Sequence, residues 1–198
     1  VCSSDLSHDD YRVVPGGIQL CVQKEETVAE REGVDYLHVR PWQPLPILAP
    51  QDEDIAVCVI LNGQDLAIVR MSVLNQALVA VVRDQAISIH IVIHHLLGHS
   101  PEQIGALLQN LPSCASEFWI HDFFSLCPSF TLLRNDVRFC NAPDLQSNAC
   151  HICVYRTERL AHVERIKKLF ELINPRILAP SAITANFWEA KSECRHRE

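Results

Sequence analysis

The sequence lacks the features that would place the chain across a membrane or on nucleic acid. No apolar run reaches the roughly 20 residues that cross a bilayer, and the apolar stretch 87–98 is short and holds three histidines. Lysine and arginine form no cluster, and the net formal charge of −7 argues against non-specific nucleic-acid binding. We therefore expect no nucleic-acid partner. A local basic patch is compatible with this charge, so peripheral membrane contact stays open.

Two well-known site signatures are also missing. No GxGxxG follows a strand, so a dinucleotide site is not indicated, and no GxSxG provides the exposed serine of an elbow-type hydrolase. No signal peptide is recognisable, and the nine cysteines are odd in number, which favours a reducing compartment. We expect a cytoplasmic protein, with the inner face of the membrane as an alternative location.

The chain has enough apolar residues to fold around a core, because 48% of its 198 residues are hydrophobic and 21% are charged. Runs rich in β-branched residues alternate with helical stripes. This alternation predicts an α/β domain with a mostly parallel sheet and helices on both faces. The expected strands of that sheet are 11–14, 34–39, 88–94, 117–121 and 176–179.

Local signals add further elements to this expectation. Asn62-Gly63 between two apolar runs predicts a hairpin. Residues 71–84 and 157–173 are expected to be helices. Ser100 followed by Pro101 predicts the start of a helix that reaches about Leu111, since serine caps a helix and proline suits its first position. Another helix is expected to begin at Ser181 as its cap.

Three polar or glycine-containing pairs fall at the expected carboxyl ends of strands or just beyond them, where ligands bind in such sheets. They are Gly16-Gly17, His94-His95 and His121-Asp122. Glycines before a helix let a phosphate approach the backbone, although a plain tight turn is the alternative. A metal at His95 and His99 is disfavoured because Gly98 interrupts the helix that would align them. For His121-Asp122, the alternative is a structural pair that ends a strand.

The irregular segment 123–156 contains four cysteines, Cys127, Cys140, Cys150 and Cys153. The last two form a CxxC pair of the kind that zinc knuckles use. A loop this long is costly to order without support. The sequence therefore predicts a structural zinc site, with a redox disulfide or four separate thiols as the alternatives.

Several motifs together resemble the N-terminal half of a group 1 (family 4) glycosyltransferase of the GT-B fold. They are PGGIQ (15–19), IHIVIHHLLGHS (89–100), HDFFSLCPSFTLLRNDVRFC (121–140), CHIC (150–153) and LAPSAITANFW (178–188). The resemblance runs from about Tyr11 to Lys191 and implies a Rossmann-like domain over 11–191. Residues 1–10, whose VCSSDL resembles translated sequencing adapter, are expected to be a non-native or disordered leader, and 192–198 a truncated tail.

The resemblance implies the acceptor-binding half of a retaining enzyme that moves a sugar from a nucleotide-sugar donor to a glycan or lipid-linked acceptor, as in cell-surface polysaccharide synthesis. His121 and Asp122 would be catalytic. Gly16 and Gly17 would approach the donor diphosphate, Gln19 would face the acceptor, and His94, His95 and Ser181 would also bind substrate. No cofactor would be needed for catalysis. The second, nucleotide-sugar domain would be missing, which would leave this fragment inactive.

Two other functions compete with this interpretation. A glycan-binding module of the same fold would recognise a sugar without transferring it. A zinc-dependent hydrolase would use the histidines as metal ligands, with one open coordination position.

Overall fold

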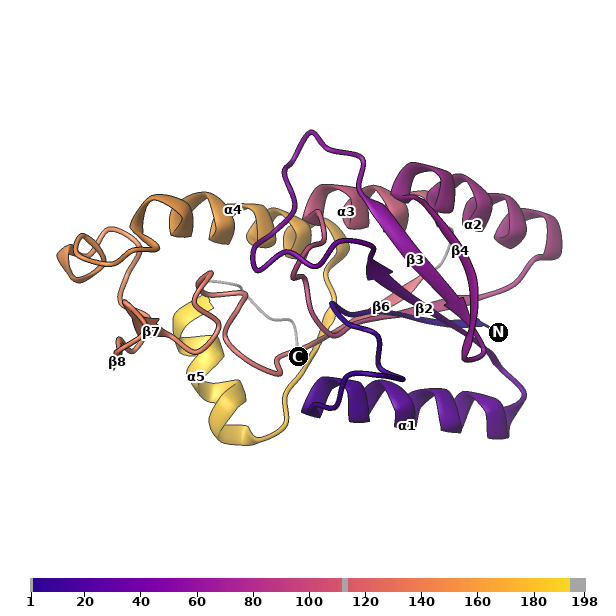
Figure 1. Ribbon diagram of the computed structural model, residues 1–198, viewed down its shortest axis with the longest axis horizontal. Helices are drawn as coiled ribbons and strands as arrows, with labels where there is room; N and C mark the ends of the chain where they lie inside the picture. Colours follow the sequence, from indigo (N-terminus) through magenta and orange to yellow (C-terminus); the bar gives the residue numbers. More distant parts are fainter. Residues whose placement is uncertain (1, 112–113, 193–198) are drawn as a thin grey trace.

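A computed structural model describes residues 2–111 and 114–192 of the chain (Figure 1). A seven-stranded sheet forms its centre, in the order β4-β3-β2-β1-β5-β6-β9. The strands are β1 (Cys2–Leu6), β2 (Asp35–Pro41), β3 (Ala56–Leu61), β4 (Gln64–Arg70), β5 (Ile89–Ile93), β6 (Ala115–Trp119) and β9 (Arg176–Leu178). The pairs β1–β2, β1–β5, β5–β6 and β6–β9 are parallel, whereas β2–β3 and β3–β4 are antiparallel.

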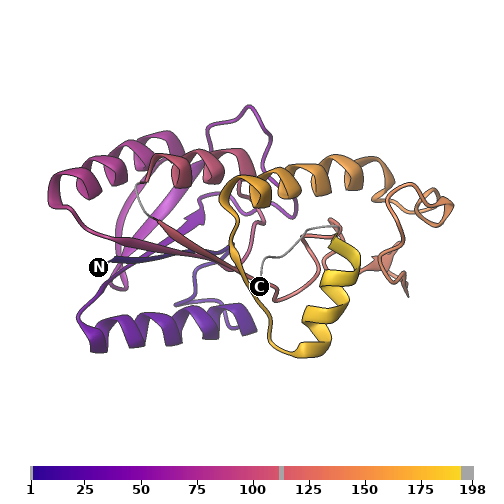
Figure 2. The same ribbon diagram turned by 180° about the vertical axis from the view of Figure 1, so that it is seen from behind.

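Helices cover both faces of this sheet. They are α1 (Gly17–Glu32), α2 (Met71–Gln85), α3 (Pro101–Asn110), α4 (Arg156–Ile173) and α5 (Ala182–Ser192). Helices α2, α3 and α4 lie on one face, and α1 and α5 lie on the other, as the front and back views agree (Figures 1 and 2). The predicted α/β architecture with a mostly parallel sheet is thus confirmed, and it is consistent with a Rossmann-like arrangement.

Two clusters of buried side chains hold the layers together. The larger one includes Leu6, Ile91, Phe118 and Ile166, and it joins the strands to the helices α2, α3 and α4. A smaller one under α1 contains Tyr11, Val22, Ala29, Tyr36 and Ile60. Apolar side chains of the sheet therefore pack against helices on both of its faces, as expected of parallel strands that helices cover on either side.

The local turn and cap signals are also confirmed. Asn62 and Gly63 have φ values of 49° and 75°, the left-handed conformations that a tight hairpin turn requires. Ser100 caps α3, because its Oγ accepts a hydrogen bond from the backbone N–H of Gln103, with Pro101 as the first helical residue. The Oγ of Ser181 accepts a bond from the N–H of Thr184 at the start of α5.

The structure corrects the expected N-terminal boundary. Residues 2–6 form β1, a central strand between β2 and β5, so they belong to the fold and are no disordered leader. Polar Asp5 is fully buried there. Both of its carboxylate oxygens lie 2.9 Å from Nδ1 of His38, which gives the buried carboxylate a hydrogen-bond partner. At the other end, Ser192 closes α5, and the remainder of the expected tail lies outside the described residues.

The strand expected at 11–14 is wrong. These residues form a turn in which the N–H groups of Val13 and Val14 bond to the carbonyl of Asp10. The side chain of Val13 is 76% exposed, so the two valines supply no strand core. Tyr11 alone of this run is buried, beneath α1.

The connection from β6 to α4 forms a lobe that projects from the end of the sheet (Figure 1). This lobe, residues 120–155, holds the two-stranded ribbon of β7 (Leu133–Arg134) and β8 (Arg138–Phe139) and the 3₁₀ turn η1 (Asn148–Cys150). Among the described residues, no helix is long and apolar enough to cross a membrane.

Candidate functional site

The carboxyl ends of β1, β5 and β6 bring their following residues to one edge of the sheet. Leu6 is level with Ile93, and Ile93 is level with Phe118, so the three strands end side by side. His94 and His95 follow β5, and His121 and Asp122 follow β6 one residue after Ile120. The sheet therefore places both predicted histidine-containing pairs next to each other.

His94 and His121 contact each other directly. Nδ1 of His94 lies 2.9 Å from Nε2 of His121, and the two rings are inclined by only 19° with centroids 5.2 Å apart. Nε2 of His94 lies 3.0 Å from Oε2 of Glu25, on α1. The His94 side chain is fully buried, whereas that of Glu25 is 30% exposed. Trp119 lies nearly parallel to both rings.

His95 and Asp122 form a second pair beside the first. Nε2 of His95 donates to Oδ2 of Asp122 over 3.0 Å, and Nδ1 of His95 accepts a bond from the N–H of Leu97. The other carboxylate oxygen of Asp122 accepts from the N–H of Phe124 at 2.8 Å. Asp122 thus caps the turn after β6 and orients His95, and the His121 ring is oriented by His94 instead.

Burial dominates the electrostatics of this edge. It lowers the pKa of His121 to about 4, and the neighbouring His94 ring adds to the effect, while Asp122 opposes it. Burial likewise lowers the pKa of His8, which packs against His95 with ring centroids 4.7 Å apart. At neutral pH His121 is therefore an uncharged imidazole, which can accept a proton or a hydrogen bond.

The glycines before α1 differ in their surroundings. A Cβ atom on Gly16 would come within 2.2 Å of Oε1 of Gln19, whose side chain folds back over it and is buried. A Cβ on Gly17 would meet nothing within 4 Å. Gly16 thus makes room for Gln19, whereas Gly17 faces open space at the N-terminus of α1. The Gln19 side chain is therefore buried and does not face solvent.

Ser181 follows β9, which is the last strand in the order of the sheet. Its hydroxyl is exposed and occupied in capping α5. Together with Ile120 and Trp188 it lines a cavity of about 700 Å³ between β9 and α5. Because Ile120 immediately precedes His121, this cavity begins next to the histidine edge.

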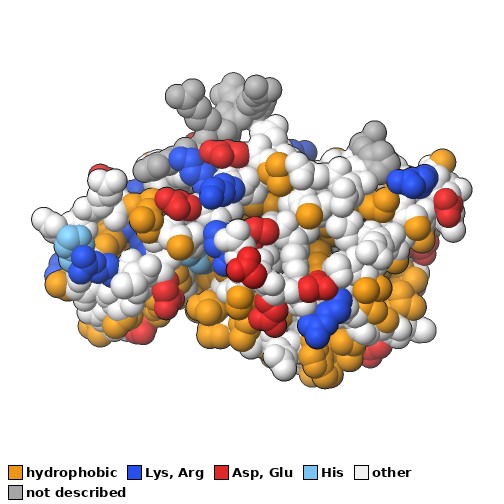
Figure 3. Space-filling view, turned by 90° about the horizontal axis from the view of Figure 1, so that it is seen from above, with side chains coloured by type: hydrophobic (Ala, Val, Ile, Leu, Met, Phe, Trp, Pro, Cys, Tyr) orange, Lys and Arg blue, Asp and Glu red, His pale blue; other side chains and the backbone are white. Residues whose placement is uncertain are grey.

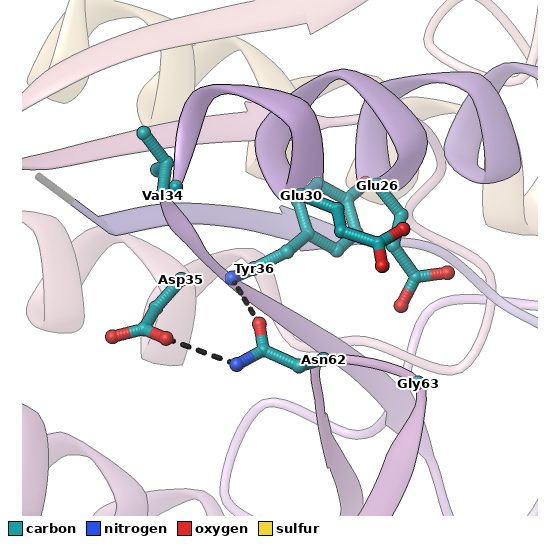
Figure 4. Close-up of a pocket in the computed structure, with 8 residues that line it drawn as sticks. Glu26, Glu30, Val34, Asp35, Tyr36, Asn62 and Gly63 are labelled. Carbon is teal, nitrogen blue, oxygen red and sulfur yellow. Dashed lines mark hydrogen bonds between the residues drawn. The ribbon is translucent and has the colours of Figure 1, made fainter.

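Other cavities lie along α1. One of about 420 Å³ separates α1 from β1, β5 and β6 and is lined by Glu25, His90 and Glu117, among others. Another, of about 470 Å³, lies at the hairpin tip and is lined by Glu26, Glu30 and Asp35 (Figure 4). There the Asn62 side chain bonds to the backbone N–H of Tyr36 and to the Asp35 carboxylate, which ties the hairpin to β2.

The four lobe cysteines are free thiols that share one region. Cys140 and Cys153 lie close enough to Cys127 to affect its titration, and burial raises the pKa of Cys127 to about 11. Sγ of Cys150 accepts a bond from Nη1 of Arg159 at 2.9 Å. Within residues 2–111 and 114–192, no group of three or more His, Cys, Asp or Glu is placed to hold a metal ion. The zinc site stays a prediction.

Glu25 is the site residue that sequence reasoning missed. Its signal was present, since Val22, Glu25 and Ala29 are spaced by three and four residues, which places them on one face of α1. Val22 and Ala29 are buried against the sheet, so an acidic residue between them points to a buried polar partner. His38 was also missed, because its partner Asp5 lies in β1, which was expected to be a leader outside the fold.

Comparison with known proteins gave no relatives: no family model, no curated protein and no solved structure matches the chain. The site is therefore interpreted from its own geometry and from the sequence motifs.

Proposed function

We propose that the chain is the acceptor-binding half of a retaining glycosyltransferase, which moves a sugar from a nucleotide-sugar donor to a glycan or lipid-linked acceptor. The observation that carries this proposal is the meeting of His94 and His121 at the carboxyl edge of the sheet, 2.9 Å apart. Ligands of open α/β sheets bind at this edge. The donor would be held mainly by a second domain outside this chain.

Two further features support the proposal. Gly17 faces open space at the start of α1, where a helix N-terminus favours an anionic group such as a diphosphate. His121 is uncharged at neutral pH and keeps its Nδ1 atom free of protein partners among the described residues. The helix N-terminus at Gly17 would bind a donor phosphate, and Nδ1 of His121 would accept a hydrogen bond from a sugar hydroxyl.

Two measurements test this function. The chain is titrated with glycans and with nucleotide sugars, and binding is followed by saturation-transfer NMR for the natural sequence and for His121→Ala. The complete reading frame that contains the chain is then assayed for transfer of labelled sugar. We expect glycan binding that His121→Ala weakens, and transfer only by the complete protein. Binding without transfer by the complete protein would favour the glycan-binding module, and no binding would reject both.

Membrane contact of the lobe is part of the same proposal, since a lipid-linked acceptor lies at a membrane surface. Val137, Phe139 and Ile152 on the lobe are 83%, 52% and 68% exposed. Arg138 lies between Val137 and Phe139 in the sequence, and Arg134 precedes Val137 by three residues. The lobe end of the molecule presents basic and apolar side chains together (Figure 3). Sedimentation with anionic vesicles tests this contact, and binding equal to that of Val137→Ser/Phe139→Ser would reject it.

Structural zinc in the lobe is also proposed, as the element that makes 120–155 a cysteine-held insertion. Its support is the proximity of Cys140 and Cys153 to Cys127. Binding would require Cys150 to leave Arg159, its present partner. Metal analysis of purified protein, with Cys153→Ser as the comparison, tests it: one zinc per chain that the variant loses would support the site, and metal-free protein would reject it.

A further inference from the structure

Three titratable side chains, one on α1 and one in each of the loops after β5 and β6, form a continuous hydrogen-bonded chain. Glu25 of α1 contacts Nε2 of His94 at 3.0 Å, and Nδ1 of His94 contacts Nε2 of His121 at 2.9 Å. At the Glu25 end of this chain, the hydroxyl of Tyr36 donates to the same Oε2 atom at 3.4 Å. The near-parallel His94 and His121 rings meet edge to edge, as an in-plane hydrogen bond between ring nitrogens requires.

The position of each hydrogen follows from the acceptor at one end. A carboxylate only accepts hydrogen bonds, so Nε2 of His94 carries a hydrogen. In a neutral ring, Nδ1 of His94 is then an acceptor, and Nε2 of His121 must donate to it. The hydrogen of His121 is thereby committed to His94. Its Nδ1 atom is left as a lone pair without a partner in the part of the chain that the structure describes.

We propose that Glu25, His94 and His121 form a proton relay, in which Glu25 is a positioning residue that makes Nδ1 of His121 a proton acceptor. A hydroxyl group of the acceptor substrate gives its proton to this Nδ1 and keeps the electron pair. The hydrogen on Nε2 of His121 then moves to Nδ1 of His94. The positive charge thus comes to lie on His94, beside the Glu25 carboxylate.

The relay has the arrangement that activated nucleophiles use elsewhere, in which a base is oriented by a third group. Its surroundings favour the uncharged resting state. His8 and His95 follow the neighbouring strands β1 and β5 and oppose a charge on His121, whereas Asp122, the next residue in the chain, supports one. The relay moves the acquired proton to His94, whose Nε2 atom lies 3.0 Å from the Glu25 carboxylate. Only the identity of the hydroxyl group rests on the proposed function.

Histidine tautomers test the relay without any transfer assay. In ¹⁵N-labelled chain at pH 7.5, long-range ¹H–¹⁵N spectra report which ring nitrogen carries hydrogen, and His94→Gln and His121→Gln assign the signals. We expect His94 and His121 both with hydrogen on Nε2. In Glu25→Ala, His94 loses the partner that fixes its hydrogen, so one or both rings should change to the Nδ1–H form or to a mixture.

Glu30→Ala is the matched control, because Glu30 is an exposed carboxylate of the same helix. It should leave both tautomers unchanged. Hydrogen on Nδ1 of His121 in the natural sequence would overturn the relay, and so would a Glu25→Ala spectrum identical to that of the control. The first of these results does not require Glu25→Ala to fold. A confirmed relay with no glycan binding would instead reject the proposed function alone.

Discussion

Nε2 of His95 donates to Oδ2 of Asp122 over 3.0 Å, so the carboxylate that follows His121 in the sequence serves the other histidine. Asp122 and His121 are neighbours in the chain but belong to two separate networks. One ties the turn after β6 to the turn after β5, since Asp122 also accepts from the N–H of Phe124. The other runs from Glu25 through His94 to His121. This division predicts that the two residues respond differently to substitution.

Asp122→Ala should reduce stability more than His121→Ala. The first change removes a capping bond and leaves Nε2 of His95, a 4% exposed side chain, without its acceptor. Unsatisfied buried groups cost about 1–3 kcal/mol, so urea unfolding should show a loss of this size. His121→Ala leaves Nδ1 of the fully buried His94 unpaired, which costs about 1 kcal/mol or more, but it removes no capping bond and should cost less than Asp122→Ala.

In the complete protein, the order of the two variants should reverse for activity. His121→Ala removes the proposed proton acceptor, and general bases typically contribute about 10²-fold or more to the rate. Asp122→Ala should lower kcat less, at a temperature where it stays folded. If His121→Ala lost stability but retained its activity per folded molecule, His121 would be a structural residue.

Gly16 and Gly17 form a matched pair for testing ligand approach. Gly16→Ala should displace the Gln19 amide, because its Cβ would lie 2.2 Å from Oε1 of Gln19, and the thermal midpoint should fall. Gly17→Ala meets no protein atom within 4 Å and should leave the midpoint unchanged. If Gly17→Ala then weakened the binding of diphosphate or nucleotide sugar by the complete protein, a ligand would approach the backbone at Gly17. Unchanged binding in that variant would remove Gly17 from the site.

The sheet could be predicted where its strands are apolar on both faces. The runs that became β2, β5, β6 and β9 are rich in hydrophobic residues, and the hairpin turn carries its Asn62-Gly63 signal. β1 could not be recognised in this way. Its burial depends on Asp5 meeting His38, which lies 33 residues away in the sequence. A buried hydrogen-bonded pair of residues far apart in the sequence has no local pattern, so the residues around Asp5 look like a polar leader.

The candidate site was predictable to the same extent. Strand ends gave His94 and His121, because parallel strands finish at one edge. The contact between the two rings, and the choice of His95 by Asp122, depend on side-chain directions that spacing does not fix. The helix α4 gives a similar case, since apolar Leu160 is 50% exposed, while polar Arg159 and His162 are buried and bond to carbonyls of the lobe.

Buried neutral histidines should make the fold sensitive to acid. Burial lowers the pKa of His99 and of His162 from 6.5 to about 4, and each Nε2–H donates to a backbone carbonyl. Between these values the unfolded chain binds more protons, so stability is full above about pH 6.5 and falls as the pH drops toward 4. With about 1.4 kcal/mol per pKa unit, each histidine accounts for roughly 3 kcal/mol.

Urea unfolding at a series of pH values from 7.5 to 4.5 checks this dependence. His162→Gln keeps a donor for the carbonyl of Phe124 but cannot be protonated in this range. The variant should lose less stability on acidification than the natural sequence. The slope of its unfolding free energy against pH should be smaller by up to the contribution of one bound proton. An equal loss in both proteins would mean that His162 does not contribute to the acid sensitivity.

Arg159 should be the residue on which the lobe depends most. Its side chain is 7% exposed and donates to the carbonyls of Leu126 and Pro143 and to Sγ of Cys150, so one guanidinium joins three points of the segment to α4. Arg159→Ala would leave these acceptors unpaired, and charged hydrogen bonds contribute about 1.5–3 kcal/mol each in the folded state. We expect a loss of at least about 3 kcal/mol, with faster proteolysis between 126 and 150. Arg156→Ala, at an exposed position three residues earlier on the same helix, is the control and should change neither quantity. Equal protease resistance of the two variants would show that the lobe is held by something other than Arg159.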